Sequence, residues 1–90
     1  MIYYTYVISS LTRNYIYVGI SNNVERRLHQ HDSGYNRTTK PYLPFEIVLI
    51  EKFPNRSEAR KREKYLKTTT GRRYIKEIIE QTRADLSTAR

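Results

Sequence analysis

Two runs of β-branched and aromatic residues near the start of the chain constrain its fold most. Residues 2–9 read Ile-Tyr-Tyr-Thr-Tyr-Val-Ile-Ser, and residues 15–20 read Tyr-Ile-Tyr-Val-Gly-Ile, with a short polar stretch between them. Residues of this kind favour strands, and a short polar connection between two such runs is typical of a hairpin. We therefore predict a β-hairpin here.

The alternation of side chains along these strands predicts a face rich in tyrosine, because side chains two residues apart point to the same side of a strand. One face of the first strand then holds Tyr4, Tyr6 and Ile8, and one face of the second holds Tyr15, Tyr17 and Gly19. The pattern does not set the register between the two strands.

The remaining elements follow from capping and periodicity. Asn22 with Glu25 predicts a helix start, and the helix is expected to end near Gly34. Residues 34–44 read as a loop, and residues 45–53 as a third strand stopped by a proline.

A second helix is expected from Arg56 to Lys67, with Asn55 and Glu58 repeating the capping pattern. A break at 68–71 and a third helix follow. The order is ββαβαα, an α/β (α+β) fold in which a three-stranded antiparallel sheet is flanked by helices. We expect one domain over residues 1–80 and a frayed tail over residues 81–90.

Composition narrows the class of protein. With 90 residues the chain has room for one small core, and its lack of cysteine excludes thiolate metal sites and a cysteine nucleophile. The absence of cysteine and of a long apolar run predicts a cytoplasmic protein that does not cross a membrane.

The net charge of +8 is unevenly placed. Residues 56–76 hold nine Lys or Arg and two Glu, a local charge of +7. Together with basic residues in the loop at 34–44, this segment predicts a surface that follows a phosphate backbone. Nucleic acid is a better partner than a membrane because no long apolar helix face accompanies the charge.

Arg27 and His31 lie one helical turn apart, on the same stripe as Val24 and Leu28, whereas Arg26 points about 100° away. They are therefore candidates for a site. The alternative from spacing alone is that Arg27 extends past the edge of the core and His31 is an ordinary cation at a helix end.

Glu63 falls on the inward stripe of the second helix with Ala59, Arg62 and Leu66. A carboxylate there needs a cationic partner, because burial disfavours its charge. That partner could be Arg27 or a nearby lysine in a structural ion pair, or a divalent metal held by a hard oxygen ligand.

Taken together, these residues resemble the GIY-YIG endonuclease superfamily, specifically its small single-domain members, which are similar to the amino-terminal nuclease domain of the bacterial excision-repair incision subunit. The resemblance covers about residues 2–80. Its first motif corresponds to Tyr4-Thr5-Tyr6, with Tyr4 in place of the family's glycine, and its second to Tyr17-Val18-Gly19. A helix with Arg27 and then a helix with Glu63 follow, in the order in which the family carries its catalytic arginine and its metal-binding glutamate.

The resemblance implies roles for individual residues. Glu63 would hold one Mg²⁺ or Mn²⁺, Arg27 would brace the scissile phosphate, and Tyr6 would accept the proton of the attacking water. Tyr has an ordinary pKa near 10, so this base role needs help from the metal, from Arg27 or from a proton acceptor such as His31. Tyr17 would order the water or phosphate. Further expected contacts to substrate are Gly19, Arg37, Lys40, Arg60, Lys64, Lys67 and Arg72.

The predicted function is a metal-dependent endonuclease acting on DNA, directed by structure rather than sequence, in repair or recombination. The small size of the chain leaves no room for a separate domain that recognises DNA sequence. Specificity would therefore come from DNA shape, from a homodimer or from a recruiting protein. The competing prediction is a nucleic-acid-binding module with weak or no catalysis.

Overall fold

Three strands and the helices that cover both faces of their sheet make up the fold. The computed structural model describes the backbone of residues 1–88 and the side chains of residues 1–84. The elements are β1 (Tyr3–Ser10), β2 (Ile16–Ser21), α1 (Val24–Asp32), the short 3₁₀ helix η1 (Lys40–Tyr42), β3 (Phe45–Phe53), α2 (Arg56–Leu66) and α3 (Thr69–Thr88). The predicted order ββαβαα is confirmed.

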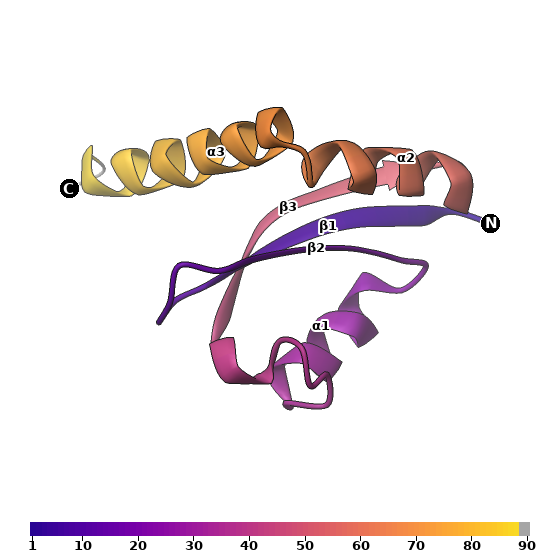
Figure 1. The fold of residues 1–90 in the computed structure, drawn as a ribbon, viewed down its shortest axis with the longest axis horizontal. Coiled ribbons are helices and arrows are strands. Elements are labelled where there is room, and N and C mark those ends of the chain that lie inside the picture. The colour runs from indigo at the N-terminus through magenta and orange to yellow at the C-terminus, as the bar shows by residue number, and fades with distance from the viewer. Residues whose placement is uncertain (89–90) are drawn as a thin grey trace.

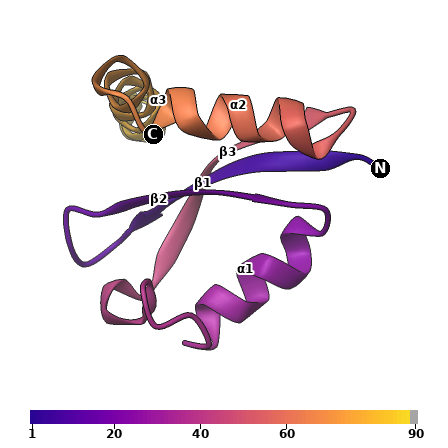
Figure 2. The same cartoon turned by 45° about the vertical axis from the view of Figure 1, so that its right-hand side comes forward.

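The sheet is antiparallel with the order β2-β1-β3, so β2 and β3 are its two edges. Helix α1 and the loop after it lie on one face, whereas α2 and α3 lie on the other (Figures 1 and 2). The predicted three-stranded sheet flanked by helices is therefore confirmed.

The register of the hairpin places the tyrosines on the α1 face. Tyr6 pairs with Gly19, and Ile8 pairs with Tyr17. Facing residues of an antiparallel pair project to the same side of the sheet, so Tyr6 and Tyr17 share a face. Their ring centroids are 6.1 Å apart.

The opposite face of the hairpin forms the core with α2 and α3. Val7 and Val18 pack with Leu66 and Ile75. The hydroxyl of Thr5 donates a hydrogen bond of 2.8 Å to the carbonyl of Ala59, which joins β1 to α2. One face of β1 therefore contributes apolar residues to the core, and the other face carries Tyr6.

The helix starts confirm one capping prediction and correct the other. Asn55 caps α2 as predicted, accepting from the Glu58 amide at 2.9 Å. In α1 the cap is Asn23, not Asn22, and its side chain accepts from the Arg26 amide at 3.0 Å. The reason is that β2 continues to Ser21, whose hydroxyl oxygen accepts from the Asn23 amide at 3.0 Å, so the helix begins one residue later.

The junction between α2 and α3 is shorter than predicted. Helix α3 already begins at Thr69, and Gly71 lies within it and is buried. A Cβ at Gly71 would collide with the carbonyl of Tyr65 and with Leu66. This glycine therefore permits close packing of α3 on the end of α2, instead of ending a helix.

Helix α3 runs on to Thr88, so residues 81–88 of the segment expected to be frayed are helical, and residues 89–90 lie outside the described part of the chain. Within that part, none of the helices has the length and apolar character that crossing a membrane requires.

Candidate active site on the tyrosine face

A buried hydrogen bond between Tyr6 and His31 lies at the centre of the candidate site. The Tyr6 hydroxyl is 3.0 Å from Nε2 of His31, and both side chains are 0% exposed. The strand pairing brings Tyr6 opposite Gly19, where a Cβ would lie 2.7 Å from the tyrosine hydroxyl. Gly19 is therefore required by the position of Tyr6, because any larger residue would displace that hydroxyl.

His31 is held on its other side by the loop after α1. Its Nδ1 is 2.8 Å from the hydroxyl oxygen of Thr39, which is also 0% exposed. The Tyr17 ring meets the imidazole edge-on at a centroid distance of 4.9 Å. His31 is thus a fully bonded histidine inside the fold, rather than a solvated cation at a helix end.

Arg27 faces the site, whereas Arg26 is exposed, as the helical stripe predicts. Its Nη1 donates to the Gln30 side-chain oxygen at 3.0 Å. Burial by itself would lower the pKa of Arg27, but interaction with the hydroxyls of Tyr6 and Tyr17 outweighs this, and its pKa is raised. The guanidinium therefore stays charged beside both tyrosines.

The surroundings shift the pKa values of Tyr6 and His31 in opposite directions. Burial, with a contribution from Tyr17, raises the pKa of Tyr6 to about 12, although Arg27 opposes this. Burial and the charge of Arg27 lower the pKa of His31, against a smaller effect of Asp32. At neutral pH the site therefore holds a protonated phenol next to a neutral imidazole, which can accept a proton.

Glu63 lies on α2, which packs on the face of the sheet opposite α1. Its side chain is 12% exposed and pairs with Arg60 at 3.6 Å and Lys67 at 3.2 Å. Of the partners expected from the sequence, the nearby lysine is observed. Arg62 instead makes two hydrogen bonds with Glu51, of 2.8 and 3.2 Å.

Glu63 could supply a carboxylate ligand to a divalent metal ion. Among the side chains that the structure describes, no three His, Cys, Asp or Glu gather into a metal cluster. Mg²⁺ commonly takes only one or two carboxylates and completes its shell with water and substrate phosphate. Glu63, shielded from solvent and flanked by two cations that could bind those phosphate oxygens, is chemically suited to this role.

The other predicted substrate contacts fall into two groups. Arg37 and Lys40 are exposed on the loop after α1, where the stem of Lys40 covers Gly34. Lys64 and Arg72 are exposed on α2 and α3, with Arg60 and Lys67. The structure thus brings together Tyr6, Tyr17, Gly19, Arg27 and His31 on one face, and it places the Glu63 group on the elements across the sheet.

Sequence reasoning did not find Thr39 or Gln30. Both bond to a predicted site residue, Thr39 to His31 and Gln30 to Arg27. Gln30 could have been found from its position three residues after Arg27, on the same side of α1. Thr39 carries no such signal, because it lies in a polar loop where threonine is common.

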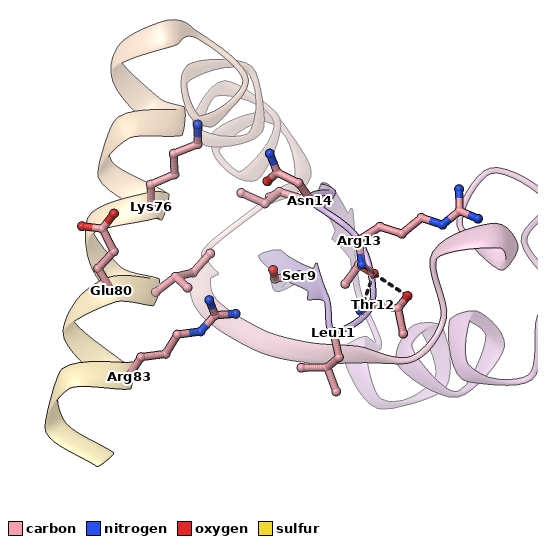
Figure 3. Close-up of a pocket in the computed structure, with 11 residues that line it drawn as sticks. Ser9, Leu11, Thr12, Arg13, Asn14, Lys76, Glu80 and Arg83 are labelled. Atoms are coloured by element: carbon pink, nitrogen blue, oxygen red, sulfur yellow. Dashed lines mark hydrogen bonds between the residues drawn. The ribbon is translucent and has the colours of Figure 1, made fainter. Parts of the chain in front are cut away.

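An open hollow of about 450 Å³ lies away from this site, between the hairpin turn and α3 (Figure 3). Lys76, Glu80 and Arg83 line it from α3, and Asn14 lines it from the turn. Arg83 also approaches Glu46 at 3.6 Å. None of the tyrosine-face residues lines this hollow, so it is separate from the Tyr6–His31 site.

A sequence model of the GIY-YIG catalytic domain matches residues 2–77, a span that includes every residue of the tyrosine face. The chain belongs to the GIY-YIG family. This family is one of nucleases that generally depend on divalent metals, and membership implies nucleic acid as the class of substrate.

Small GIY-YIG proteins are similar over nearly the whole chain. A UPF0213 protein of Natronomonas pharaonis is 32% identical over 81 residues, covering 89% of this chain and 94% of the relative. A UPF0213 protein of Staphylococcus haemolyticus is 34% identical over 80 residues, covering 88% and 96%. The solution NMR structure of a UPF0213 protein from Bacillus halodurans superimposes with a TM-score of 0.53 at 26% identity, covering 87% of this chain and 85% of that one.

Proposed function

We propose that this protein is a divalent-metal-dependent endonuclease that hydrolyses phosphodiester bonds in DNA. It would recognise DNA structure rather than sequence and would serve repair or recombination. The observation that carries the proposal is the buried hydrogen bond between Tyr6 and His31 beside Arg27, in a chain that matches a catalytic-domain family.

The Tyr6–His31 pair can take up the proton of the attacking water. A phenolate at Tyr6 is disfavoured, because burial raises the pKa of this residue to about 12. Tyr6 can instead accept the water proton on its oxygen while its own proton passes to Nε2 of His31, which lies 3.0 Å away. Tyr6 then stays neutral throughout, and His31 carries the positive charge.

Arg27 would bind the scissile phosphate. It is half-buried, points to the tyrosine face and keeps its charge there. A guanidinium can contact two phosphate oxygens at once, and the negative charge that builds up on them in the transition state strengthens this contact. Tyr17 would orient the water or the phosphate, and Gly19 would allow the backbone to approach.

Glu63 would hold Mg²⁺ or Mn²⁺, with Arg60, Lys64, Lys67 and Arg72 following the phosphate backbone. The support is topological: β2 is an edge strand that both α1 and α2 contact, so a strand of DNA along that edge would meet residues from both helices. The metal would supply charge neutralisation at the phosphoryl oxygens and the leaving oxygen.

The deciding experiment is a cleavage screen with Mg²⁺, Mn²⁺ or EDTA against DNA and RNA single strands, duplexes, flaps and junctions. We expect metal-dependent cleavage of branched or single-stranded DNA, and its loss in Tyr6→Phe. Tyr4→Phe is the matched control, since Tyr4 is on the same face of β1 but, in the part of the chain that the structure describes, makes no hydrogen bond to His31 or Arg27. Cleavage by Tyr6→Phe at the parent rate would contradict the proton-transfer role.

The second candidate is a nucleic-acid-binding module without catalysis. The observation that favours it is the raised pKa of Tyr6, which makes this residue a poor base unless His31 takes over its proton. Salt-dependent binding to DNA or RNA, with no cleavage of any substrate in the screen, would support this alternative and contradict the nuclease.

A further inference from the structure

A continuous line of hydrogen bonds runs from Tyr6 through His31 into the loop after α1. Its three links are Tyr6 hydroxyl to His31 Nε2 at 3.0 Å, His31 Nδ1 to Thr39 Oγ1 at 2.8 Å, and Thr39 Oγ1 to the Asn36 carbonyl at 3.4 Å. The side chains of the first three residues are all 0% exposed. Water therefore does not compete for these bonds, and the protein groups alone decide where the protons lie.

The local backbone explains why Thr39 points inward. The amides of Thr39 and Lys40 both donate to the Asn36 carbonyl, at 3.2 and 3.0 Å, which closes a tight turn just before η1. This turn directs the Thr39 side chain toward His31 near the end of α1. The hydroxyl of Thr39 then sits between an imidazole nitrogen and a carbonyl oxygen.

The chemistry of the two ends sets the direction of the bonds. The Asn36 carbonyl can only accept, and the guanidinium of Arg27, which interacts with the Tyr6 hydroxyl, can only donate. A Thr39 hydroxyl that donates to Asn36 must accept from Nδ1–H of His31. Nε2 is then unprotonated and accepts from Tyr6, whose oxygen is left free to accept from Arg27.

The opposite tautomer is less well satisfied. With the proton on Nε2, Thr39 would have to donate to Nδ1 and give up its bond to Asn36. His31 and Arg27 would then both donate to the Tyr6 oxygen, and the Tyr6 proton would turn to the Tyr17 hydroxyl, which also interacts with that of Tyr6. Thr39 keeps its bond to Asn36 and also bonds to the imidazole only when Nδ1 of His31 is protonated.

We propose that Thr39 is a positioning residue: its hydroxyl holds His31 as the Nδ1–H tautomer, with Nε2 aimed at Tyr6. The consequence for catalysis rests on the proposed function, because only this tautomer can accept a proton from Tyr6. The tautomer itself does not depend on nuclease activity and can be measured without it.

Long-range ¹H–¹⁵N NMR of the whole chain tests the tautomer, at a pH where His31 is neutral. The parent protein is expected to show a protonated Nδ1 and an unprotonated Nε2 at His31, with exposed His29 as internal reference. Thr39→Val keeps the side-chain shape without the hydroxyl and should lose this preference. Thr39→Ser should restore it, and Thr38→Val, at an exposed neighbour, should leave it unchanged.

Two NMR outcomes would overturn the proposal: Nε2–H at His31 in the parent protein, or an unchanged Nδ1–H preference in Thr39→Val. The parent spectrum decides the first even if Thr39→Val fails to fold. In the cleavage assay, Thr39→Val should lower kcat about 10- to 100-fold with little change in KM, as for partners that orient functional histidines, and Thr39→Ser should recover most of it. An unchanged kcat in Thr39→Val would also overturn the positioning role. A parent that cleaves nothing would contradict the proposed function and leave the NMR test valid.

Discussion

The Tyr6 hydroxyl and Nε2 of His31 are 3.0 Å apart inside the fold, although 25 residues separate them in the chain. Tyr6 comes from β1 and His31 from the last turn of α1, so the contact exists only because α1 folds back over the hairpin. Because burial and charge shift the pKa of Tyr6 upward and that of His31 downward, the proton rests on the tyrosine until a reaction moves it.

Removing the Arg27 guanidinium should impair cleavage strongly. We expect Arg27→Ala to lower kcat by about 10²-fold or more, because a charged donor to the phosphate oxygens is lost. Arg26→Ala removes the same charge from the exposed neighbouring position and should change kcat little at matched salt. Initial-rate kinetics on the best substrate of the screen compare the two variants. Equal losses of kcat would mean that Arg27 acts through its charge in general and not through contact with the scissile phosphate.

Glu63 should be needed for metal binding. Glu63→Gln keeps the shape of the side chain but removes the carboxylate charge, so weaker binding of Mn²⁺ is expected in titrations monitored by electron paramagnetic resonance, with the nucleic acid present. Glu58→Gln, on the first turn of the same helix, is the control. Parent-like Mn²⁺ affinity in Glu63→Gln would remove Glu63 as the ligand, whether or not cleavage is detected.

His31 should make stability depend on pH in the acid range. Its pKa is lowered in the folded protein, chiefly by burial, so below the ordinary value of about 6.5 the unfolded chain binds more protons than the folded one. Stability should therefore fall as the pH drops below about 6.5, until the folded-state pKa of His31 is passed. Urea unfolding across pH 4.5–8 in parent, His31→Gln and His29→Gln proteins measures this. The pH dependence should shrink only in His31→Gln.

Gly19 should tolerate no side chain. A Cβ there would lie 2.7 Å from the Tyr6 hydroxyl and 2.9 Å from the Tyr17 ring. We expect Gly19→Ala to displace Tyr6, costing about 1–3 kcal/mol of unfolding free energy and most of the cleavage activity. NMR should show a weakened hydrogen bond between the Tyr6 hydroxyl and Nε2 of His31. Full activity in Gly19→Ala would show that Tyr6 need not keep this position.

Gly71 should matter for stability and not for chemistry. Its missing side chain lets α3 pack against the end of α2, so Gly71→Ala should lower the free energy of unfolding by about 1–3 kcal/mol, measured by urea denaturation. Below the unfolding transition, kcat should stay near the parent value, because α2 and α3 lie on the face of the sheet opposite the α1 side that holds Tyr6 and His31 (Figure 2).

Much of the candidate site was predictable because it repeats on regular elements. Period-two alternation placed Tyr6 and Tyr17 each on one face of its strand, and helical spacing separated Arg27 from exposed Arg26. The register of the hairpin then brought the two tyrosines to the same face. The ionic partners were less predictable. Arg62 bonds to Glu51 on β3, and Glu63 pairs with Arg60 and Lys67, because long side chains choose among several neighbours once the helix has docked.

The start of α1 and the junction between α2 and α3 show the limits of local sequence patterns. Asn22 and Asn23 are equivalent as capping residues, and only the extent of β2 selected Asn23. Gly71 reads as a helix end in the sequence, yet it lies inside α3 because the packing against Leu66 requires a residue without a side chain.

From the sequence alone came the order of elements, the tyrosines on one face of each hairpin strand and the arginine on the inward stripe of α1, since all three depend on backbone periodicity. Tertiary structure decided the state of the reactive groups. Folding of the 33–44 loop brought Thr39 against His31, and burial separated the proton affinities of His31 and Tyr6. The physical reason is that a hydrogen bond and a desolvation energy depend on which distant residues surround a group, and neighbours along the chain do not determine that.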